Sequence, residues 1–339
     1  MPRLYTTYTK DEDGNEHWQY KDVEHINAYL LPGPDIYVRP RNLPLSRAVP
    51  KMFFGNMPID GGNLILSEDE KNLFIKKYPQ DKKFVRQYIG AEEFIHNKKR
   101  YCLWLVDATP DEIKKNKFIY ERVKLCKEFR LRSKRDATKK LAEVPHLFGF
   151  ISQPKTNYIL VPSVSSERRK YIPMDFVDKD IICSNLNLMI PDAEVWHFGI
   201  LTSRVHMVWT KTVCGRLKSD IRYSAKIVYN NFIWVKMEFI DYAELILAAE
   251  KILKVRKNYP NASLADLYDE VTMPKDLRDA HREVDKIVMR MYRLDEDMTD
   301  EEIAIELLQH YKFVTDYLAE NNLKQLTRQN SDDEEFDEE

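Results

Sequence analysis

The sequence predicts an α+β fold in which a β-rich domain with inserted helices is followed by a C-terminal helical region. Between residues 145 and 209 short apolar runs such as "NYILVPSV" and "NLMIP" follow one another closely, which is typical of strands separated by turns. From Tyr242 onward, "AELILAAEKILKVRKNYP" has the apolar spacing of an amphipathic helix. These patterns predict four regions: an N-terminal linker or hairpin (1–26), the β-rich domain (27–235), the helical region (236–328) and a disordered acidic tail (329–339).

The first 80 residues contain signals for a hairpin, an irregular segment and a short helix. A turn at residues 13–15, Asp-Gly-Asn, can join two short strands. Residues 31–63 hold six of the sixteen prolines and four of the nine glycines, a density that indicates irregular or extended chain. Ser67 and Glu70 have the spacing of a capping box, which predicts a short helix over "KNLFIKKY".

The middle of the chain contains the longest helical pattern of the first half and most of the predicted strands. Tyr88, Phe94 and the run "RYCLWLVD" are predicted to lie in strands. Residues 111–141 are predicted to be helical and hold 12 Lys and Arg side chains, concentrated in "KEFRLRSKRDATKK". The runs "HLFGFI", "DIICS", "WHFGILTS" and "VHMVW" are predicted to be strands. Further helices are introduced by Ser263, Met273-Pro274 and Asp300.

Composition places the chain among intracellular globular proteins. With 339 residues and 43% hydrophobic content, the chain is long enough for two domains or one large one. No apolar run approaches the roughly 18 residues of a membrane span, and the N-terminus lacks the apolar segment of a signal peptide. The four cysteines are widely spaced, with no Cys-x-x-Cys, which favours reduced thiols. We therefore expect a cytoplasmic protein with no membrane partner.

The net charge of −2 conceals an asymmetry along the chain. Residues 295–339 hold 16 acidic side chains against three basic ones, a charge of −13, which leaves +11 on residues 1–294. A basic body favours a polyanionic partner, and the acidic end can solvate the chain or compete for the same surface. Solubility alone would also account for the acidic end.

Several classes of enzyme site are disfavoured by the residues present. The nine glycines include no Gly-x-Gly, so neither a dinucleotide fingerprint nor a phosphate-binding P-loop is present. His197 and His206 lie in strand-like sequence, where Glu194 would face away from His197, so we expect no metal site there. The triplet Glu112-Ile113-Lys114 resembles part of a metal-dependent nuclease site, but no partner carboxylate accompanies it.

The run "YNNFIW" partly resembles the motif with which methyltransferases hold a flipped base. Asn231 and Phe232 are present, but the two prolines that fix the backbone of an Asn-Pro-Pro-Tyr motif are missing. We therefore expect no catalytic residue in this chain. Basic side chains interleaved with Ser and Tyr in "SSERRKYIP" and "CGRLKSDIRYSAK" are instead suited to phosphates and base edges.

Many ordered blocks resemble the MmeI-like adenine-specific DNA methyltransferases of restriction–modification type. They include "PLSRAVPKMFFGNMPIDGGNLILSEDE", "RQYIGAEEFIHNKKRYCLWLVDATPDEI", "YILVPSVSSERRKYIP", "HFGILTSRVHM" and "VCGRLKSDIRYSAKIVYNNFIW", and the similarity runs from about Asn27 to about Tyr292. In that family these blocks form the target-recognition domain and the helical region after it. The cofactor-binding and Asn-Pro-Pro-Tyr motifs lie upstream in the family and do not occur in this sequence.

The resemblance implies a module that recognises specific double-stranded DNA and positions an adenine for a catalytic domain supplied in cis or in trans. This chain would then hold no cofactor, and S-adenosylmethionine would belong to the catalytic domain. Two alternatives remain: a protein-interaction module with a basic face, and a self-contained metal-dependent nuclease. A steep loss of DNA binding with salt, together with sequence preference, distinguishes DNA recognition from the first. Metal-dependent cleavage by the purified chain would indicate the second.

The resemblance also implies roles for individual residues. In the family, polar residues just after the Gly-Arg-Leu block help to set the accepted base pair, and the matching residues here are Lys218 and Asp220, with Arg222 beside them. In an extended segment these three side chains would point the same way. The phosphate contacts that we expect from the residue types of the basic helix and the basic segments are Arg130, Arg132, Lys134, Arg135, Ser165, Ser166, Arg168, Arg169, Ser203, Arg204, Arg216, Tyr223 and Lys226.

Overall fold

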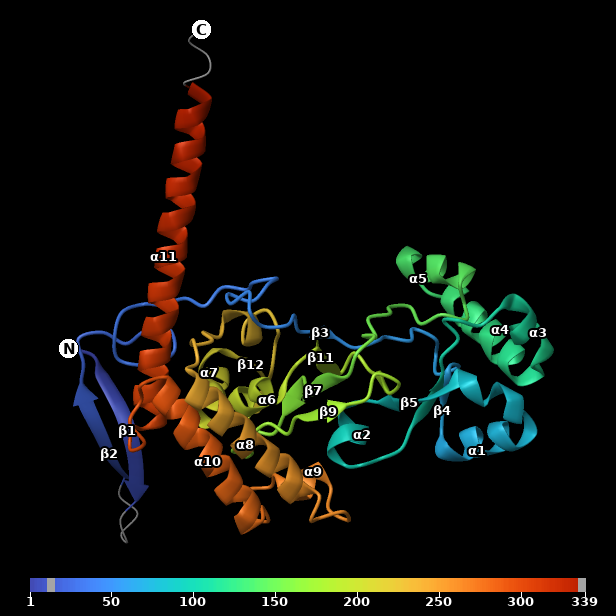
Figure 1. Ribbon diagram of the computed structural model, residues 1–339, viewed down its shortest axis with the longest axis horizontal. Helices are drawn as coiled ribbons and strands as arrows, with labels where there is room; N and C mark the ends of the chain where they lie inside the picture. Colours follow the sequence, from blue (N-terminus) through green and yellow to red (C-terminus); the bar gives the residue numbers. More distant parts are fainter. Residues whose placement is uncertain (11–15, 335–339) are drawn as a thin grey trace.

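The computed structural model of the protein describes the backbone of residues 1–10 and 16–334 and the side chains of residues 1–5 and 17–321. Its strands form four small sheets, and helices cover and extend them, so the α+β prediction is confirmed. Figure 1 shows an elongated molecule with the N-terminal hairpin and α11 at one end and the helices α1 and α3–α5 at the other.

The N-terminal sheet is a two-stranded antiparallel hairpin. Its strands are β1 (Arg3–Lys10) and β2 (Glu16–Asp22), in agreement with the two short strands expected there. The predicted turn at 13–15 lies outside the described residues. Lys21 on β2 bonds Glu301 on α11 at 3.0 Å, and this contact ties the hairpin to the C-terminal helices.

The central sheet has the strand order β3-β11-β7-β9. Its strands are β3 (Phe53–Phe54), β11 (Asn187–Pro191), β7 (Tyr158–Pro162) and β9 (Asp175–Val177). Every residue of β7 is buried, because other elements cover both faces of this strand. A strand buried on both faces has a continuous apolar run instead of alternation, which explains the pattern "YILVP".

Two of the runs predicted as strands are helices. "WHFGILTS" contains α6 (Val195–Leu201), and "VHMVW" lies in α7 (Arg204–Val213). Ser203 caps α7 by accepting a hydrogen bond from the backbone N–H of His206, and Glu194 and His197 form a capping box for α6. Most residues of both helices are buried, so their short and nearly continuous apolar runs resemble those of a buried strand.

The outlying part of the molecule has its own sheet and its own core. The sheet order is β10-β5-β6-β4, formed by β10 (Ile182–Cys183), β5 (Val85–Ile89), β6 (Tyr101–Leu103) and β4 (Ile65–Leu66). Leu64, Phe74 and Cys102 are among the residues of this core. The helical elements here are α1 (Glu68–Lys77), η1 (Pro79–Phe84), α2 (Ala91–Ile95), α3 (Pro110–Lys115), α4 (Lys117–Leu131), α5 (Asp136–Lys140) and η2 (Leu141–Glu143).

Within this part, one prediction is confirmed and two are corrected. Ser67 and Glu70 form the predicted capping box at the start of α1. Phe94 lies in the short helix α2 and not in a strand. The predicted helix over 111–141 is divided into α3, α4 and α5, because the backbone is extended at Asn116 and again at Arg135, and the Asn116 side chain caps α4.

The C-terminal helices are α8 (Phe239–Arg256), α9 (Leu264–Leu267), α10 (Lys275–Met291) and α11 (Asp300–Glu334). α8 packs against α10 and α6, and a single core contains residues of both the β-rich domain and these helices. α11 extends beyond the boundary of 328 that we expected for the helical region, while residues 335–339 of the acidic tail lie outside the described residues. Among the helices described, none is long and apolar enough to cross a membrane.

Candidate nucleic-acid interface

The two basic segments of the sequence meet in a small three-stranded sheet. β12 (Gly215–Leu217) and β13 (Asp220–Arg222) form a hairpin, and β13 also pairs with β8 (Val164–Ser165). Residues Lys218 and Ser219 form the turn between the hairpin strands, since Leu217 pairs with Asp220. The sheet therefore places the start of "SSERRK" beside "GRLKSDIR".

The prediction that Lys218, Asp220 and Arg222 share one extended segment is wrong at Lys218. This residue has a φ of 58°, in the left-handed region, because the chain reverses there. Asp220 and Arg222 are two residues apart on β13 and lie on the same face of the strand. Lys218 is therefore presented at the tip of the hairpin, and Asp220 and Arg222 along its second strand.

Asp220 also contacts the basic loop, which we define as residues 166–170. Its carboxylate oxygen Oδ1 accepts a hydrogen bond from the backbone N–H of Glu167 at 3.3 Å. Arg169 in the same loop is partly buried, and this burial lowers the pKa of its guanidinium, while Asp220 and Asp269 oppose the shift. The hairpin and the basic loop thus form one connected unit.

Exposed cations surround this unit. The side chains are exposed at Arg168, Lys170, Lys218, Arg222 and Lys226. Within the part of the chain that the structure describes, none of the five has an acidic partner within ion-pair distance. Positive charge that no neighbouring carboxylate neutralises is what a polyanion would meet on approach.

Arg216 is exposed but has a second role in the hairpin. Its guanidinium donates hydrogen bonds to the carbonyl oxygens of Ser219 at 3.3 Å and Lys211 at 3.2 Å. These bonds connect the turn and the end of α7 to β12. Ser166, at the start of the basic loop, is partly buried and its carbonyl accepts the N–H of Arg169 at 3.2 Å.

Three of the expected phosphate contacts are buried side chains. Ser165 is 2% exposed, and Ser203 is completely buried as the cap of α7. Tyr223 is 2% exposed, and its hydroxyl bonds Nε2 of His206 at 2.9 Å. Burial raises the pKa of the Tyr223 phenol well above its ordinary value. Buried side chains cannot reach a phosphate, so these three residues are corrected from phosphate contacts to structural residues.

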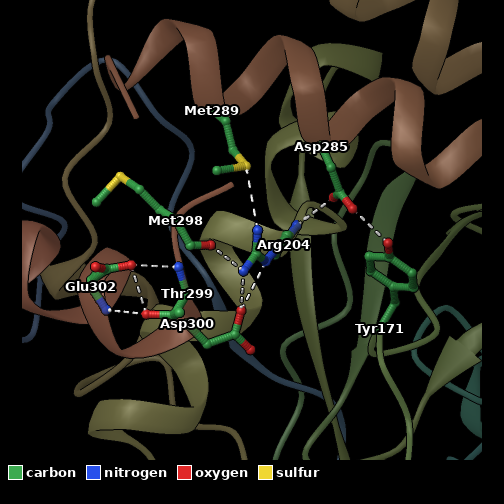
Figure 2. Close-up of polar contacts among 8 residues, drawn as sticks. All are labelled: Tyr171, Arg204, Asp285, Met289, Met298, Thr299, Asp300 and Glu302. Atoms are coloured by element: carbon green, nitrogen blue, oxygen red, sulfur yellow. Dashed lines mark hydrogen bonds and ion pairs between the residues drawn. The ribbon is translucent and has the colours of Figure 1, made fainter. Parts of the chain in front are cut away.

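Arg204 is partly buried, and its guanidinium already has partners within the protein (Figure 2). Its guanidinium bonds Oδ1 of Asp300 at 2.8 Å and the carbonyl of Met298 at 2.7 Å, and it approaches Sδ of Met289 at 3.9 Å. Its backbone N–H donates to Oδ1 of Asp285 at 2.6 Å. Arg204 therefore connects α7 to the start of α11 and to α10, and we correct its expected role as a phosphate contact.

Arg130 on α4 was expected to contact phosphate, and the structure contradicts this prediction. It is completely buried, although it lies in the most basic stretch of the sequence. Its guanidinium donates hydrogen bonds of 2.7–3.1 Å to five backbone carbonyls, those of Pro58, Ile59, Leu141, Val144 and Leu147. A guanidinium whose donors are used in this way cannot also bind a phosphate.

The neighbours of Arg130 are exposed and form a separate basic patch. Arg132, Lys134 and Arg135 lie at the end of α4 and before α5, and only Arg132 has an ion pair among the described residues, with Glu128 at 3.5 Å. Figure 1 places α5 and β12 in different parts of the molecule. The expected phosphate contacts thus fall into three groups: cations around the hairpin and the basic loop, cations at the end of α4, and residues whose side chains are buried or bonded within the protein.

Two arginines that sequence reasoning missed extend the surface beside the hairpin. The backbone N–H of Arg41 donates to Lys226 and that of Leu45 to Asn230, each at 2.9 Å, so the segment 39–47 runs beside 226–231. Arg39 and Arg47 are exposed in this segment and have no ion pair within the described ranges. The signal was present in "RPRNLPLSR", which its prolines led us to treat only as irregular chain.

Asn231 in "YNNFIW" has a structural role. It lies in η3 (Tyr229–Asn231) and is completely buried. Its amide donates to the carbonyls of Arg39 at 3.0 Å and Lys226 at 2.8 Å, and its Oδ1 accepts from Nε of Arg41 at 3.1 Å. Asn231 therefore holds the segment 39–41 against the end of the hairpin region.

His197 and His206, which we considered as metal ligands, form hydrogen bonds within the protein. Nδ1 of His197 accepts the backbone N–H of Glu194 at 2.9 Å, and His206 bonds Tyr223. Burial lowers the pKa of His197 to about 4 and that of His206 to about 3. Among the described residues, no group of three or more His, Cys, Asp or Glu side chains is placed to hold a metal ion.

Comparisons with known proteins match both regions of the chain. A family model described as the MmeI target recognition domain matches residues 32–236, and one described as the MmeI C-terminal domain matches residues 243–319. A relative from Bacillus subtilis (strain 168), DNA methyltransferase A, is 43% identical over 296 residues, which is 87% of this chain and 33% of the relative. The chain therefore spans about a third of the length of this relative.

A solved structure has the same fold. It is that of the Type IIL restriction-modification enzyme MmeI in complex with DNA, with a TM-score of 0.84 and 41% sequence identity. The match covers 91% of this chain and 41% of the solved chain. The basic hairpin lies within the first matched region, and the second covers α9, α10 and most of α8 and α11. The chain thus belongs to the MmeI family, of which it carries the target recognition domain and the C-terminal domain.

Proposed function

We propose that this chain recognises a specific sequence of duplex DNA within an adenine-N6 methyltransferase of restriction–modification type. In this role it positions a target adenine for a methyltransferase catalytic domain. The observation that carries the proposal is the joining of the β12–β13 hairpin to the basic loop, with exposed cations around both. The related enzyme MmeI was solved in complex with DNA, which supports DNA as the ligand of this chain.

The hairpin supplies side chains suited to base edges. Lys218 at the tip can donate to O6 or N7 of guanine, and the carboxylate of Asp220 can accept from N4 of cytosine. Arg222 lies on the same face of β13 as Asp220, where its guanidinium can reach a neighbouring base edge or a phosphate. A two-residue turn is narrow enough to enter the major groove of B-form DNA.

The flanking cations supply affinity without sequence information. Phosphate contacts position a protein on the duplex and account for most of its salt dependence. We assign this role to the exposed residues Arg39, Arg47, Arg168, Lys170 and Lys226 near the hairpin, and to Arg132, Lys134 and Arg135 at the end of α4. Arg169 is partly buried, and the guanidinium of Arg216 bonds two backbone carbonyls, so we assign these two residues to the shape of the surface that the cations occupy.

Catalysis belongs to another domain in this proposal. The chain has no Gly-x-Gly and no Asn-Pro-Pro-Tyr, so it lacks the backbone that would hold S-adenosylmethionine and the acceptors that would hold a flipped adenine. The relative that matches is about three times as long as the matched part, which leaves room for such a domain in cis. A separate subunit would serve equally in trans.

Binding selection on a randomised duplex library tests the proposal. We expect a defined base preference, and an affinity for the selected duplex that falls steeply as salt is raised from about 50 to 200 mM. Equal affinity for all duplexes would contradict recognition of a specific sequence. No DNA binding, together with binding to an acidic protein, would favour the protein-interaction alternative, and cleavage of the duplex with Mg²⁺ or Mn²⁺ would favour the nuclease.

A further inference from the structure

The segment that follows the basic loop is held at both ends by the C-terminal helices. At its start the hydroxyl of Tyr171 donates to Oδ2 of Asp285 on α10 at 2.6 Å. At its end the carbonyl of Met174 accepts from Nη1 of Arg256 on α8 at 2.7 Å, and the same guanidinium approaches Asp175 at 3.7 Å. Residues 171–175 therefore lie in a clamp formed by two helices of a different domain.

Asp285 connects this clamp to α7 as well (Figure 2). Its two carboxylate oxygens are shared between the Tyr171 hydroxyl and the backbone N–H of Arg204, the first residue of α7. A carboxylate at the N-terminus of a helix is stabilised by the helix dipole. Asp285 is only 6% exposed, and burial raises the pKa of its carboxyl, opposed by these two hydrogen bonds.

Buried aromatic side chains complete the contact between residues 171–175 and the C-terminal helices. The ring of Tyr171 stacks on His281, one turn before Asp285 on α10, with centroids 4.1 Å apart and an interplanar angle of 18°. Nε2 of His281 bonds the hydroxyl of Tyr268 at 2.8 Å, and this hydroxyl also accepts from Nε of Arg256 at 2.8 Å. The hydrogen bonds and the stack form one continuous network from Asp285 to Arg256.

The basic loop 166–170 has few contacts of its own. The N–H groups of Glu167, Arg168 and Arg169 bond, respectively, Asp220 at 3.3 Å, Oγ of Ser166 at 3.4 Å and the carbonyl of Ser166 at 3.2 Å. All three bonds are long, and the loop is mostly exposed. Apart from the bond to Asp220, its position therefore depends on its ends, which are β8 on one side and Tyr171 on the other.

We propose that Asp285, acting through the Tyr171 hydroxyl, is a positioning residue for DNA recognition by the basic loop. Asp285 itself is buried and cannot reach DNA, but it decides where Arg168 and Lys170 stand relative to the β12–β13 hairpin. The C-terminal domain thus takes part in recognition without contacting DNA at this point. This inference rests on the proposed function only for its ligand, since the positioning of the loop can be measured without DNA.

The substitution Tyr171→Phe tests whether Asp285 positions the loop, because this change removes the hydroxyl that bonds Asp285 and leaves the ring stacked on His281. Tyr292→Phe is the matched control: Tyr292 is also buried, on the C-terminal helices, and its hydroxyl bonds the carbonyl of Ile233 at 2.6 Å, away from the loop. Hydrogen exchange is measured at the amides of residues 167–169. We expect faster exchange in Tyr171→Phe than in wild type, and no change in Tyr292→Phe.

Asp285→Asn is a second variant, in which the side chain can still bond both the Tyr171 hydroxyl and the backbone N–H of Arg204. Its amide oxygen still accepts from Arg204, and its NH₂ can donate to the Tyr171 hydroxyl, so loop exchange should stay close to that of wild type. Equal loop exchange in Tyr171→Phe and Tyr292→Phe would overturn the inference.

A double-mutant cycle on the selected duplex separates positioning from general stability. The loss of affinity caused by Arg168→Ala should be at least about twofold smaller in the Tyr171→Phe background than in wild type, as for interacting residues. Additive effects of the two substitutions would contradict the inference, because a merely structural change would lower both affinities by the same factor. If wild type binds no duplex DNA, the proposed function fails, and the exchange data alone then decide whether Asp285 positions the loop.

Discussion

The carboxylate of Asp220 accepts the backbone N–H of Glu167 across 3.3 Å, so a residue proposed to contact a base also holds the neighbouring loop. The pairing of β13 with β8 brings the two together. The bond from Asp220 to the loop forms without DNA, so it favours one arrangement of hairpin and loop before DNA arrives, which lowers the entropy cost of binding.

The first prediction concerns the base pair contacted by Lys218 and Asp220. The ammonium of Lys218 at the hairpin tip and the carboxylate of Asp220 two residues later can contact the two halves of one G·C pair, and exchanged charges should favour the opposite orientation. Combining Lys218→Glu with Asp220→Arg should invert a G·C preference, at about 1–3 kcal/mol for each good base contact. Either change alone should mainly lose affinity, because the altered side chain then faces an edge of like polarity.

Selection on a randomised duplex library measures this preference for wild type and for the double variant. Lys226→Ala is the control, since an exposed cation that contacts phosphate should lower affinity without altering the selected bases. If the double variant selects the wild-type base at every position, Lys218 and Asp220 do not contact a base pair.

The second prediction concerns the basic patch at the end of α4. Arg132→Ala combined with Arg135→Ala should weaken binding to all duplexes about equally, because both side chains are exposed and carry no base information. The slope of log affinity against log salt should fall by roughly one for each lost contact. Anisotropy titrations at several salt concentrations measure it, and a changed base preference with an unchanged slope would be inconsistent with phosphate contacts.

The third prediction follows from the burial of Arg130. Arg130→Ala leaves five backbone carbonyls without their donor, and a buried unsatisfied acceptor costs about 1–3 kcal/mol. We therefore expect a loss of unfolding free energy of at least about 3 kcal/mol in denaturant titrations. Arg132→Ala, two residues away and exposed, is the control and should change stability by less than about 0.5 kcal/mol. Similar stabilities of the two variants would contradict the structural role.

The fourth prediction concerns acid stability. Burial lowers the pKa of His206 to about 3, below its unfolded value of 6.5, so His206 supports stability above pH 6.5 and this support is lost as the pH falls. Between pH 7 and pH 5 the loss is about 2 kcal/mol for one such histidine. His206→Gln should therefore show a smaller fall in unfolding free energy over this range than wild type. The exposed residue His96, replaced by Gln, provides the control, and parallel pH profiles for all three proteins would refute the prediction.

The fifth prediction is that the 339-residue chain by itself neither binds S-adenosylmethionine nor transfers a methyl group. The reason is the lack of a glycine loop and of the paired prolines. Isothermal titration calorimetry at micromolar concentrations measures cofactor binding, and a methyl-transfer assay on the selected duplex measures activity. Saturable binding of the cofactor would overturn the assignment of catalysis to another domain.

Local signals in the sequence were sufficient for part of the fold. The capping box at Ser67, the helix after Tyr242 and the hairpin of the first 22 residues follow from residues close together in the chain. The apolar runs at 195–201 and 204–213 predict strands, because a short helix with most of its residues buried has a nearly continuous apolar run, as a buried strand does. Their capping residues, Glu194 and Ser203, were the only local indication of helix.

The sequence by itself determined the family, the α+β class and the two basic segments, because these depend on residue identities and their order. Only the tertiary structure decided which cations face solvent. Arg130 is buried, and its guanidinium bonds carbonyls as distant in the chain as that of Pro58. Arg204 bonds Asp300, whereas Arg168 and Lys218 have no such side-chain partners among the described residues. Exposure of a charged side chain is set by long-range contacts that bring its partners to it, and local composition does not encode those contacts.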